Sequence, residues 1–84
     1  MKVQLLGKEP CGLCEDALLL LQVLKQEYLF DLEEINIYND DELIEKYHLK
    51  IPVVLINGQE VDYGQVNIET VEAYLKKEKF SENS

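Results

Sequence analysis

The apolar positions of the chain divide it into short runs and longer helical patterns. A short apolar run over residues 2–6 is followed by a loop and then by a helical pattern over residues 12–28. In the helical segment, apolar side chains recur at steps of three and four residues, which is the spacing of one helix face. These side chains are Cys14, Ala17, Leu18, Leu21, Leu24 and Tyr28. We therefore predict a strand that leads into a helix with this face turned inward.

Three further apolar residues, Leu19, Leu20 and Val23, widen the apolar zone of this helix beyond one stripe. We expect them to pack into the core beneath the C-terminal helix. The alternative is a surface that binds a partner.

The middle of the chain continues the alternation of strand and helix patterns. Residues 30–37 predict a second strand, the acidic stretch 39–42 begins a second helix, and residues 51–56 predict a third strand. Acidic side chains suit the positive N-terminal end of a helix. The apolar face of this helix consists of Leu43, Ile44 and Tyr47.

A hairpin and a last helix complete the pattern. Asn57-Gly58 is a strong signal for a two-residue turn with positive φ at both positions, and residues 59–62 then return antiparallel. Asn67 is placed to cap the last helix. The inward face of that helix is predicted to consist of Ile68, Val71, Tyr74 and Leu75.

The predicted element order is β-α-β-α-β-β-α. Its first β-α-β unit requires parallel strands with a right-handed crossover, and the hairpin adds an antiparallel strand. With helices on both faces, this order predicts the thioredoxin fold, an α/β structure with a four-stranded mixed sheet flanked by three helices. The length of 84 residues leaves room for one core. We expect a single domain over residues 1–80 and a flexible tail over Ser81–Ser84.

Composition and charge exclude several classes of protein. The formal net charge is −9. Phosphate binding requires clustered Lys and Arg, so we expect neither a nucleic acid nor an anionic membrane as partner. Two cysteines are too few for a disulfide-stapled secreted scaffold, and the run Leu18–Leu21 is too short to cross a bilayer. Because Met1 leads into a strand pattern without signal-peptide segments, we expect a cytoplasmic protein.

Cys11 and Cys14 lie where the first strand turns into the first helix. The unpaired N–H groups and the positive dipole end at a helix N-terminus favour an anion. This placement is expected to lower the pKa of the Cys11 thiol and to make Cys11 the nucleophile. Cys14, one turn further on and facing inward, is expected to be the resolving thiol.

Charged side chains around the cysteine pair act in opposite directions. Lys8 brings a positive charge that favours a thiolate at Cys11, whereas Glu9, Glu15 and Asp16 bring negative charge that raises a thiol pKa. The sequence therefore predicts the direction of each contribution but not the reduction potential.

Two other functions fit a Cys-x-x-Cys motif. Such a motif can be half of a zinc site, but His48 lies in a different loop and no second pair is present, so we expect no metal held within one chain. A metal or cluster shared between two chains, each contributing two cysteines, stays open. The other alternative is a binding module that holds an extended peptide or a partner while its cysteines stay idle.

The sequence resembles the small glutaredoxins, and most of all the divergent glutaredoxin-like proteins of the thioredoxin superfamily. The resemblance covers nearly the whole chain. Its anchors are Cys11-Gly12-Leu13-Cys14, Ile51-Pro52-Val53 and the Asn57-Gly58 hairpin. It implies that the Ile51–Pro52 bond is cis and faces the cysteine pair. The backbone of Ile51 would then pair with an extended substrate segment.

The resemblance implies a thiol–disulfide oxidoreductase of cell redox homeostasis and electron transport with no tightly bound cofactor. We expect a monomer, although the sequence does not determine the oligomeric state. Its substrates would be proteins that carry disulfides or mixed disulfides. Its reductant would be glutathione or a thioredoxin-type reductase. The catalytic residues would be Cys11 and Cys14. The residues predicted to bind substrate are Lys8, Gly12, Leu13, Ile51 and Pro52, together with Tyr63, for which packing at the rim of the site is the alternative.

Two features around the motif bear on glutathione as the reductant. Typical glutaredoxins have Pro-Tyr between the cysteines, where this chain has Gly12-Leu13. Lys8 does match the basic residue that would meet a glutathione carboxylate.

The segment after the hairpin departs further from the glutaredoxin pattern. Aligned from Pro52, Asp62 and Tyr63 take the place of two glycines. Gln65 and Val66 take the place of the acidic pair that grips the amino end of glutathione. The sequence thus supports a redox site more strongly than it supports a glutathione site.

Overall fold

A computed structural model describes the backbone of residues 1–82 and the side chains of residues 1–78. The predicted element order is confirmed, with one additional short 3-10 turn, η1. The elements are β1 (Lys2–Gly7), α1 (Gly12–Lys25), β2 (Asp31–Asn36), η1 (Ile37–Asn39), α2 (Asp41–Tyr47), β3 (Val53–Ile56), β4 (Gln59–Tyr63) and α3 (Ile68–Glu82).

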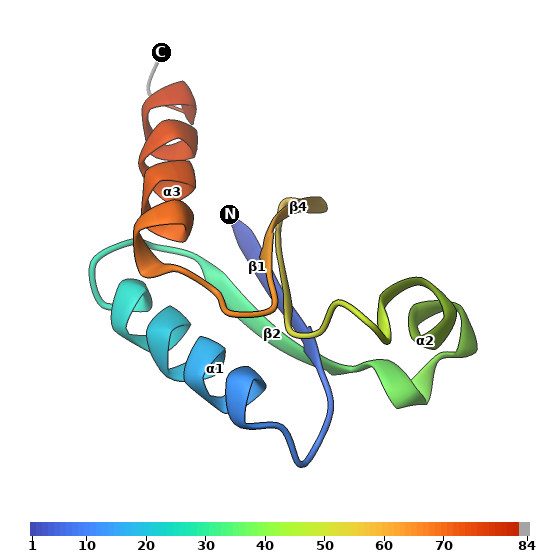
Figure 1. Cartoon of the computed structure of the whole chain (residues 1–84). Helices are drawn as coiled ribbons and strands as arrows, with labels where there is room; N and C mark the ends of the chain where they lie inside the picture. The colour runs from blue at the N-terminus through green and yellow to red at the C-terminus, as the bar shows by residue number, and fades with distance from the viewer. Residues whose placement is uncertain (83–84) are drawn as a thin grey trace.

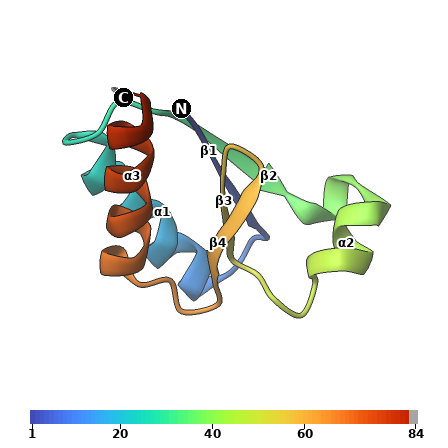
Figure 2. The same ribbon diagram turned by 90° about the horizontal axis from the view of Figure 1, so that it is seen from above.

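The four strands form one mixed sheet in the order β2-β1-β3-β4. β1 and β2 are parallel, as a β-α-β crossover requires, whereas β3 is antiparallel to both β1 and β4. Helices α1 and α3 lie on one face of this sheet and α2 lies on the other (Figures 1 and 2). The predicted thioredoxin fold is therefore confirmed.

Each face of the sheet has its own core because successive side chains of a strand point to opposite sides. On the α1 and α3 side, the fully buried residues include Val3, Leu21, Val54, Ile56, Val71 and Leu75. On the α2 side, the buried cluster consists of Leu6, Ile37, Tyr47 and Val53. The central strands β1 and β3 contribute to both cores, so the end of β1 is held firmly where the chain leaves it for α1.

The hairpin between β3 and β4 has the predicted geometry. Asn57 has φ of 51° and Gly58 has φ of 84°, the left-handed backbone that a two-residue turn of this kind needs. Asn57 also joins the turn to β1, since its N–H donates to the Lys2 carbonyl at 2.8 Å and its side-chain oxygen accepts from the Lys2 N–H at 3.1 Å.

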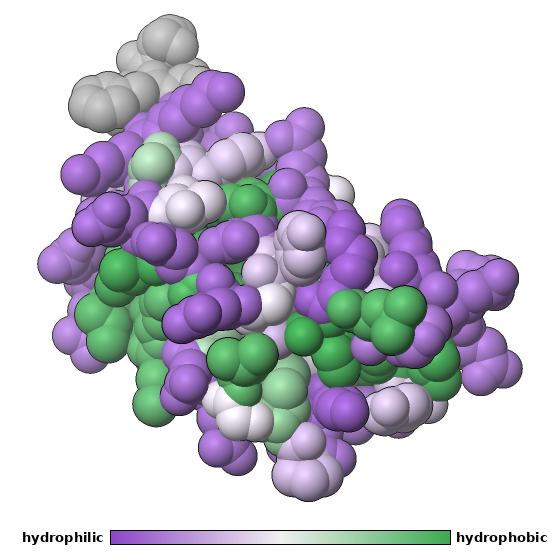
Figure 3. All heavy atoms as spheres, viewed as in Figure 1, coloured by the Kyte–Doolittle hydropathy of each residue, from purple (hydrophilic) through white to green (hydrophobic). Residues whose placement is uncertain are grey.

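The expectation that the three extra apolar residues of α1 pack into the core is wrong for two of them. Leu19 is 61% exposed and Val23 is 54% exposed, whereas Leu20 is partly buried against the core. At 3.6 residues per turn, Leu19 and Val23 lie roughly 160° around the helix from the fully buried Leu21. Both side chains are therefore part of the exposed surface of the molecule, on which Figure 3 shows apolar areas among the polar ones.

Two expectations about α3 also need correction. Ile68 is exposed rather than turned to the sheet, because it is the first residue of the helix and precedes the buried Val71 by almost a full turn. The helix runs to Glu82, so the first half of the tail expected over Ser81–Ser84 is helical. Asn83 and Ser84 lie outside the described residues.

Candidate active site

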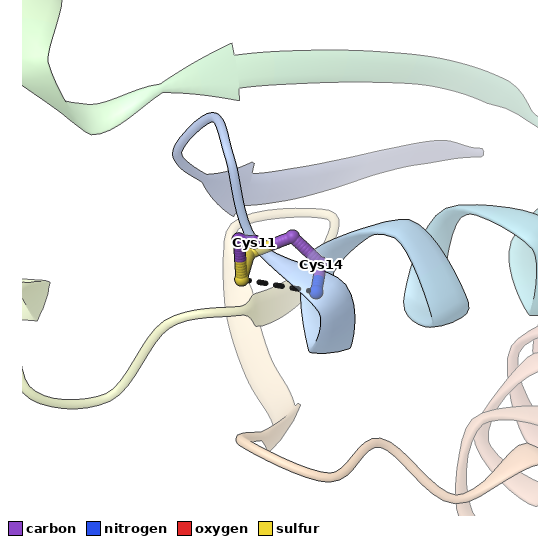
Figure 4. Close-up of a disulfide and its surroundings, with 2 residues drawn as sticks. All are labelled: Cys11 and Cys14. Atoms are coloured by element: carbon purple, nitrogen blue, oxygen red, sulfur yellow. Dashed lines mark hydrogen bonds between the residues drawn. A yellow bond between two sulfur atoms is a disulfide. The ribbon is translucent and has the colours of Figure 1, made fainter.

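The cysteine pair forms a disulfide at the start of α1, with 5.2 Å between the two Cα atoms. Cys11 is the N-cap residue, with extended backbone at φ −158° and ψ 112°. Its sulfur accepts the backbone N–H of Cys14 at 3.2 Å (Figure 4), and its carbonyl accepts the Glu15 N–H at 3.1 Å. The Cys11 sulfur thus takes the place of the side-chain oxygen that usually caps a helix N-terminus.

The two sulfur-bearing residues differ in their access to solvent. Cys11 is half-buried, whereas Cys14 is only 8% exposed. A sulfur that attacks a substrate has to be reached from outside, and one that attacks the resulting mixed disulfide does not. The arrangement therefore fits Cys11 as the attacking group and Cys14 as the resolving group.

A pocket of about 320 Å³ lies beside the pair, between the start of α1, the end of β1 and the end of β2. Lys8 and Cys14 both line it, and so do the carboxylates of Glu9, Glu15 and Glu34. Lys8 is thus brought close to the cysteine pair as predicted, but in the company of three acidic side chains. Glu34 was not anticipated, because its place opposite Leu5 depends on the β1–β2 register.

The segment Ile51-Pro52 approaches the pair from the neighbouring strand. The β1–β3 ladder ends with Leu6 opposite Val53, which brings Pro52 to the same end of β1 as Gly7 and Cys14. The Ile51–Pro52 bond is cis, and so is Glu9–Pro10. Pro52 is buried and Ile51 is half-buried.

Tyr63 is held next to this segment by backbone and side-chain contacts. The Gly64 N–H donates to the Pro52 carbonyl at 2.8 Å and to the Lys50 carbonyl at 3.2 Å. The Lys50 ammonium lies 4.7 Å from the centre of the Tyr63 ring and 2.5 Å from a carboxylate oxygen of Glu60. The hydrogen bond to Glu60 raises the pKa of Lys50 above its ordinary value, so Lys50 stays positively charged beside the site. This cluster was not predicted from the sequence.

Gly12 and Leu13 are exposed on the first turn of α1, next to Cys11. The site therefore presents Leu13 and Tyr63 as exposed apolar side chains. His48 is exposed at the end of α2, where its Nδ1 lies 2.9 Å from the Ile44 carbonyl oxygen. This agrees with its interpretation as a surface residue rather than a catalytic base.

Asp62 was considered above only for its position in the place of a glycine. One oxygen of its carboxylate accepts the Tyr63 N–H and the other accepts the Asn67 N–H, both at 2.9 Å. Asn67 in turn accepts the Glu69 N–H at 2.8 Å, which confirms its predicted role as the cap of α3. Asp62 thus organises the loop that leads into α3.

Gly7 lies at the base of the site and was not predicted to be part of it. Gly7 is the last residue of β1 and lies next to Cys14. A Cβ atom placed on Gly7 would lie 3.0 Å from the Cys14 sulfur. The available signal was a glycine at the end of an apolar strand, which can mark a close approach of another group to the backbone.

Neither a metal site nor a membrane span is found in the part of the chain that the structure describes. No three or more His, Cys, Asp and Glu side chains among those residues are grouped so as to hold a metal ion. No helix there combines the length and the apolar character that crossing a bilayer requires.

Comparison with known proteins places this site in a family. The family described as the Glutaredoxin-like domain (DUF836) matches residues 2–76. The solution structure of a protein from Nitrosomonas europaea is similar over 88% of this chain and 89% of its own, with 33% identity and a TM-score of 0.78.

Two more distant structures share the fold. A protein from X. campestris is 22% identical over 89% of this chain and 96% of its own, with a TM-score of 0.75. Thioredoxin 1 from Thermosipho africanus is 23% identical over 94% of this chain and 99% of its own, with a TM-score of 0.62. Together with the cysteine pair at disulfide distance, the fold supports a thiol–disulfide redox function in general. The chain belongs to the glutaredoxin-like domain family of the thioredoxin superfamily.

Proposed function

We propose that this protein is a thiol–disulfide oxidoreductase that reduces protein disulfides or mixed disulfides. The observation that carries the proposal is the position of Cys11. Its sulfur caps α1 and accepts the Cys14 N–H, while the second sulfur lies within bonding reach and almost out of solvent. A helix N-terminus stabilises negative charge, and the thiolate is the form of cysteine that attacks a disulfide.

The proposed reaction is a two-step exchange. The Cys11 thiolate attacks one sulfur of the substrate disulfide, and the other substrate sulfur leaves as a thiolate that takes up a proton. Cys14, after losing its proton, attacks the Cys11 sulfur of the mixed disulfide and releases the second substrate thiolate. The substrate gains two electrons and two protons, and the protein is left with the Cys11–Cys14 disulfide. An external thiol donor then reduces that disulfide.

Substrate binding is assigned to the exposed rim of the site. An extended substrate segment would pair with the backbone of Ile51 beside Pro52, and the apolar side chains of Leu13 and Tyr63 would contact its flanks. Lys8 would lie on the other side of the cysteine pair, in the pocket that it shares with the acidic residues.

For the donor, we favour a dithiol protein over glutathione. Both oxygens of Asp62 are engaged in the loop before α3, and the Tyr63 ring is fixed by Lys50. By the alignment from Pro52, these side chains would take the place of the two glycines that leave space for the tripeptide in the glutaredoxin pattern. A dithiol donor needs access only to the Cys11 sulfur, which is the more exposed of the two.

The proposal predicts catalysed reduction of a protein disulfide such as that of insulin. We expect turnover well above the uncatalysed rate with a thioredoxin-type reductase and NADPH as donor, and slower turnover with glutathione at equal thiol concentration. The variant with both Cys11→Ser and Cys14→Ser is the control. Turnover equal to that of the control with both donors would contradict the proposed activity, and faster turnover with glutathione would contradict the assignment of the donor.

A further inference from the structure

The Cys14 sulfur lies in space that a side chain on Gly7 would fill. A Cβ atom at Gly7 would be 3.0 Å from the Cys14 sulfur and 3.3 Å from the Cys14 Cβ. Carbon atoms in favourable contact are about 3.5–4.0 Å apart, and sulfur is larger than carbon. Any other residue at position 7 would therefore force this part of the site to move.

The backbone itself does not require glycine at this position. Within the described chain, the glycines with positive φ are Gly58 and Gly64, so Gly7 is not among them. Gly7 continues the regular ladder between β1 and β2, where it pairs with Asn36. The close approach of Cys14 is therefore the structural reason for a glycine at position 7.

The surroundings leave little room for adjustment on the strand side. β1 is paired with β2 along its length and with β3 up to Leu6, and Leu6 is fully buried in the core on the α2 side. A clash at position 7 would therefore displace the Cys14 sulfur or shift the first turn of α1, because Gly7 is paired with Asn36 of β2 and follows a residue that is paired on both edges.

The two redox states differ in how easily the sulfur can move. In the disulfide, the Cys14 sulfur is held in a small ring with Cys11 and cannot rotate away from β1. In the dithiol the ring is open, so the cross-link no longer prevents rotation about the Cα–Cβ bond of Cys14. A side chain at position 7 would thus cost more free energy in the disulfide than in the dithiol.

We propose that Gly7 is a positioning residue that gives the Cys14 sulfur its place against β1 and thereby favours the closed disulfide over the dithiol. The inference builds on the proposed function in assuming that the pair cycles between these two states. It assigns to Gly7 no contact with substrate and no part in proton transfer.

The first test is the equilibrium between the protein and a reference dithiol such as dithiothreitol. We expect Gly7→Ala to shift the equilibrium constant about tenfold toward the reduced protein, which corresponds to a reduction potential about 30 mV less negative. A constant within twofold of the wild-type value would overturn the inference. This measurement needs no substrate. A shifted equilibrium in a protein that turns over no disulfide would leave the role of Gly7 intact and refute the proposed activity.

The second test is a double-mutant cycle on stability, with Gly7→Ala, Cys14→Ala and the two combined. We expect Gly7→Ala to lower the melting temperature of the oxidised protein and to have a much smaller effect in the Cys14→Ala background, where the sulfur is gone. If Gly7→Ala fails to fold but the combined variant folds, the inference is supported. Equal losses in both backgrounds, or failure of both variants to fold, would overturn it, because the cost would then not come from the Cys14 sulfur.

Discussion

Replacement of Cys11 by serine is expected to reduce the disulfide-reduction rate to the uncatalysed background. The serine hydroxyl is not ionised near neutral pH and cannot form a disulfide, so the first exchange step is lost. Serine is one of the preferred N-cap residues, and its oxygen can accept the Cys14 N–H as the sulfur does. We therefore expect α1 to keep its cap while activity disappears.

Two quantities are measured for Cys11→Ser: its rate of insulin reduction and its melting temperature. The matched reference for stability is the reduced wild-type protein, because the variant cannot form the Cys11–Cys14 cross-link. Activity close to that of the wild type would reject Cys11 as the nucleophile. A large loss of melting temperature relative to the reduced wild type would show that the sulfur has a structural role that serine does not replace.

Replacement of Cys14 by serine is expected to give the second largest effect, which is accumulation of a mixed disulfide. Cys11 remains half-buried at the helix N-terminus and can still attack a substrate. The buried sulfur that would release the substrate is missing. The covalent complex should then persist until an external thiol attacks it.

Mass spectrometry of Cys14→Ser after mixing with an oxidised protein substrate should show a mass equal to the sum of the two chains. Cys11→Ser serves as the control and should show no adduct. Turnover of protein disulfides should fall strongly, and any activity that is retained should be confined to glutathionylated substrates. Unchanged turnover of protein disulfides, with no adduct, would show that Cys14 is not the resolving thiol.

The parts of the fold that were predictable depend on local chemistry. The Asn57-Gly58 turn needs backbone conformations that few residues adopt, and the inward face of α1 follows from the spacing of Ala17, Leu21 and Leu24. These preferences act within a few residues along the chain. They suffice to order the strands and helices and to place the cysteine pair at a helix N-terminus.

The parts that were missed or wrong depend on residues that are distant in the sequence. Leu19 and Val23 continue an apolar run, but the direction in which they point is set by how α1 packs on the sheet. The contact of Gly7 with Cys14 requires α1 to fold back over β1. A single sequence carries only a weak local signal for such pairings.

The candidate site shows the same division. The two sulfurs are neighbours because both cysteines lie at the start of α1, where they are three residues apart. The contacts of Lys50 with Glu60 and Tyr63, in contrast, join a loop to β4, the second strand of the hairpin. The role of Asp62 in shaping the loop before α3 likewise became visible only with its two hydrogen bonds. The position of the cysteine pair at the start of α1 could thus be predicted from the sequence, whereas the contacts of the residues around it could be predicted only in part.

The central claim is that the start of α1 stabilises a thiolate on Cys11. The most direct measurement is the pKa of Cys11 in the Cys14→Ala variant, obtained from the pH dependence of its alkylation rate or of its thiolate absorbance. The Cys14 backbone N–H and the positive helix end favour the charged form, while Glu9 and Glu15 oppose it. We expect a pKa clearly below the value of about 8.5 for a free cysteine. A pKa at or above that value would contradict the central claim.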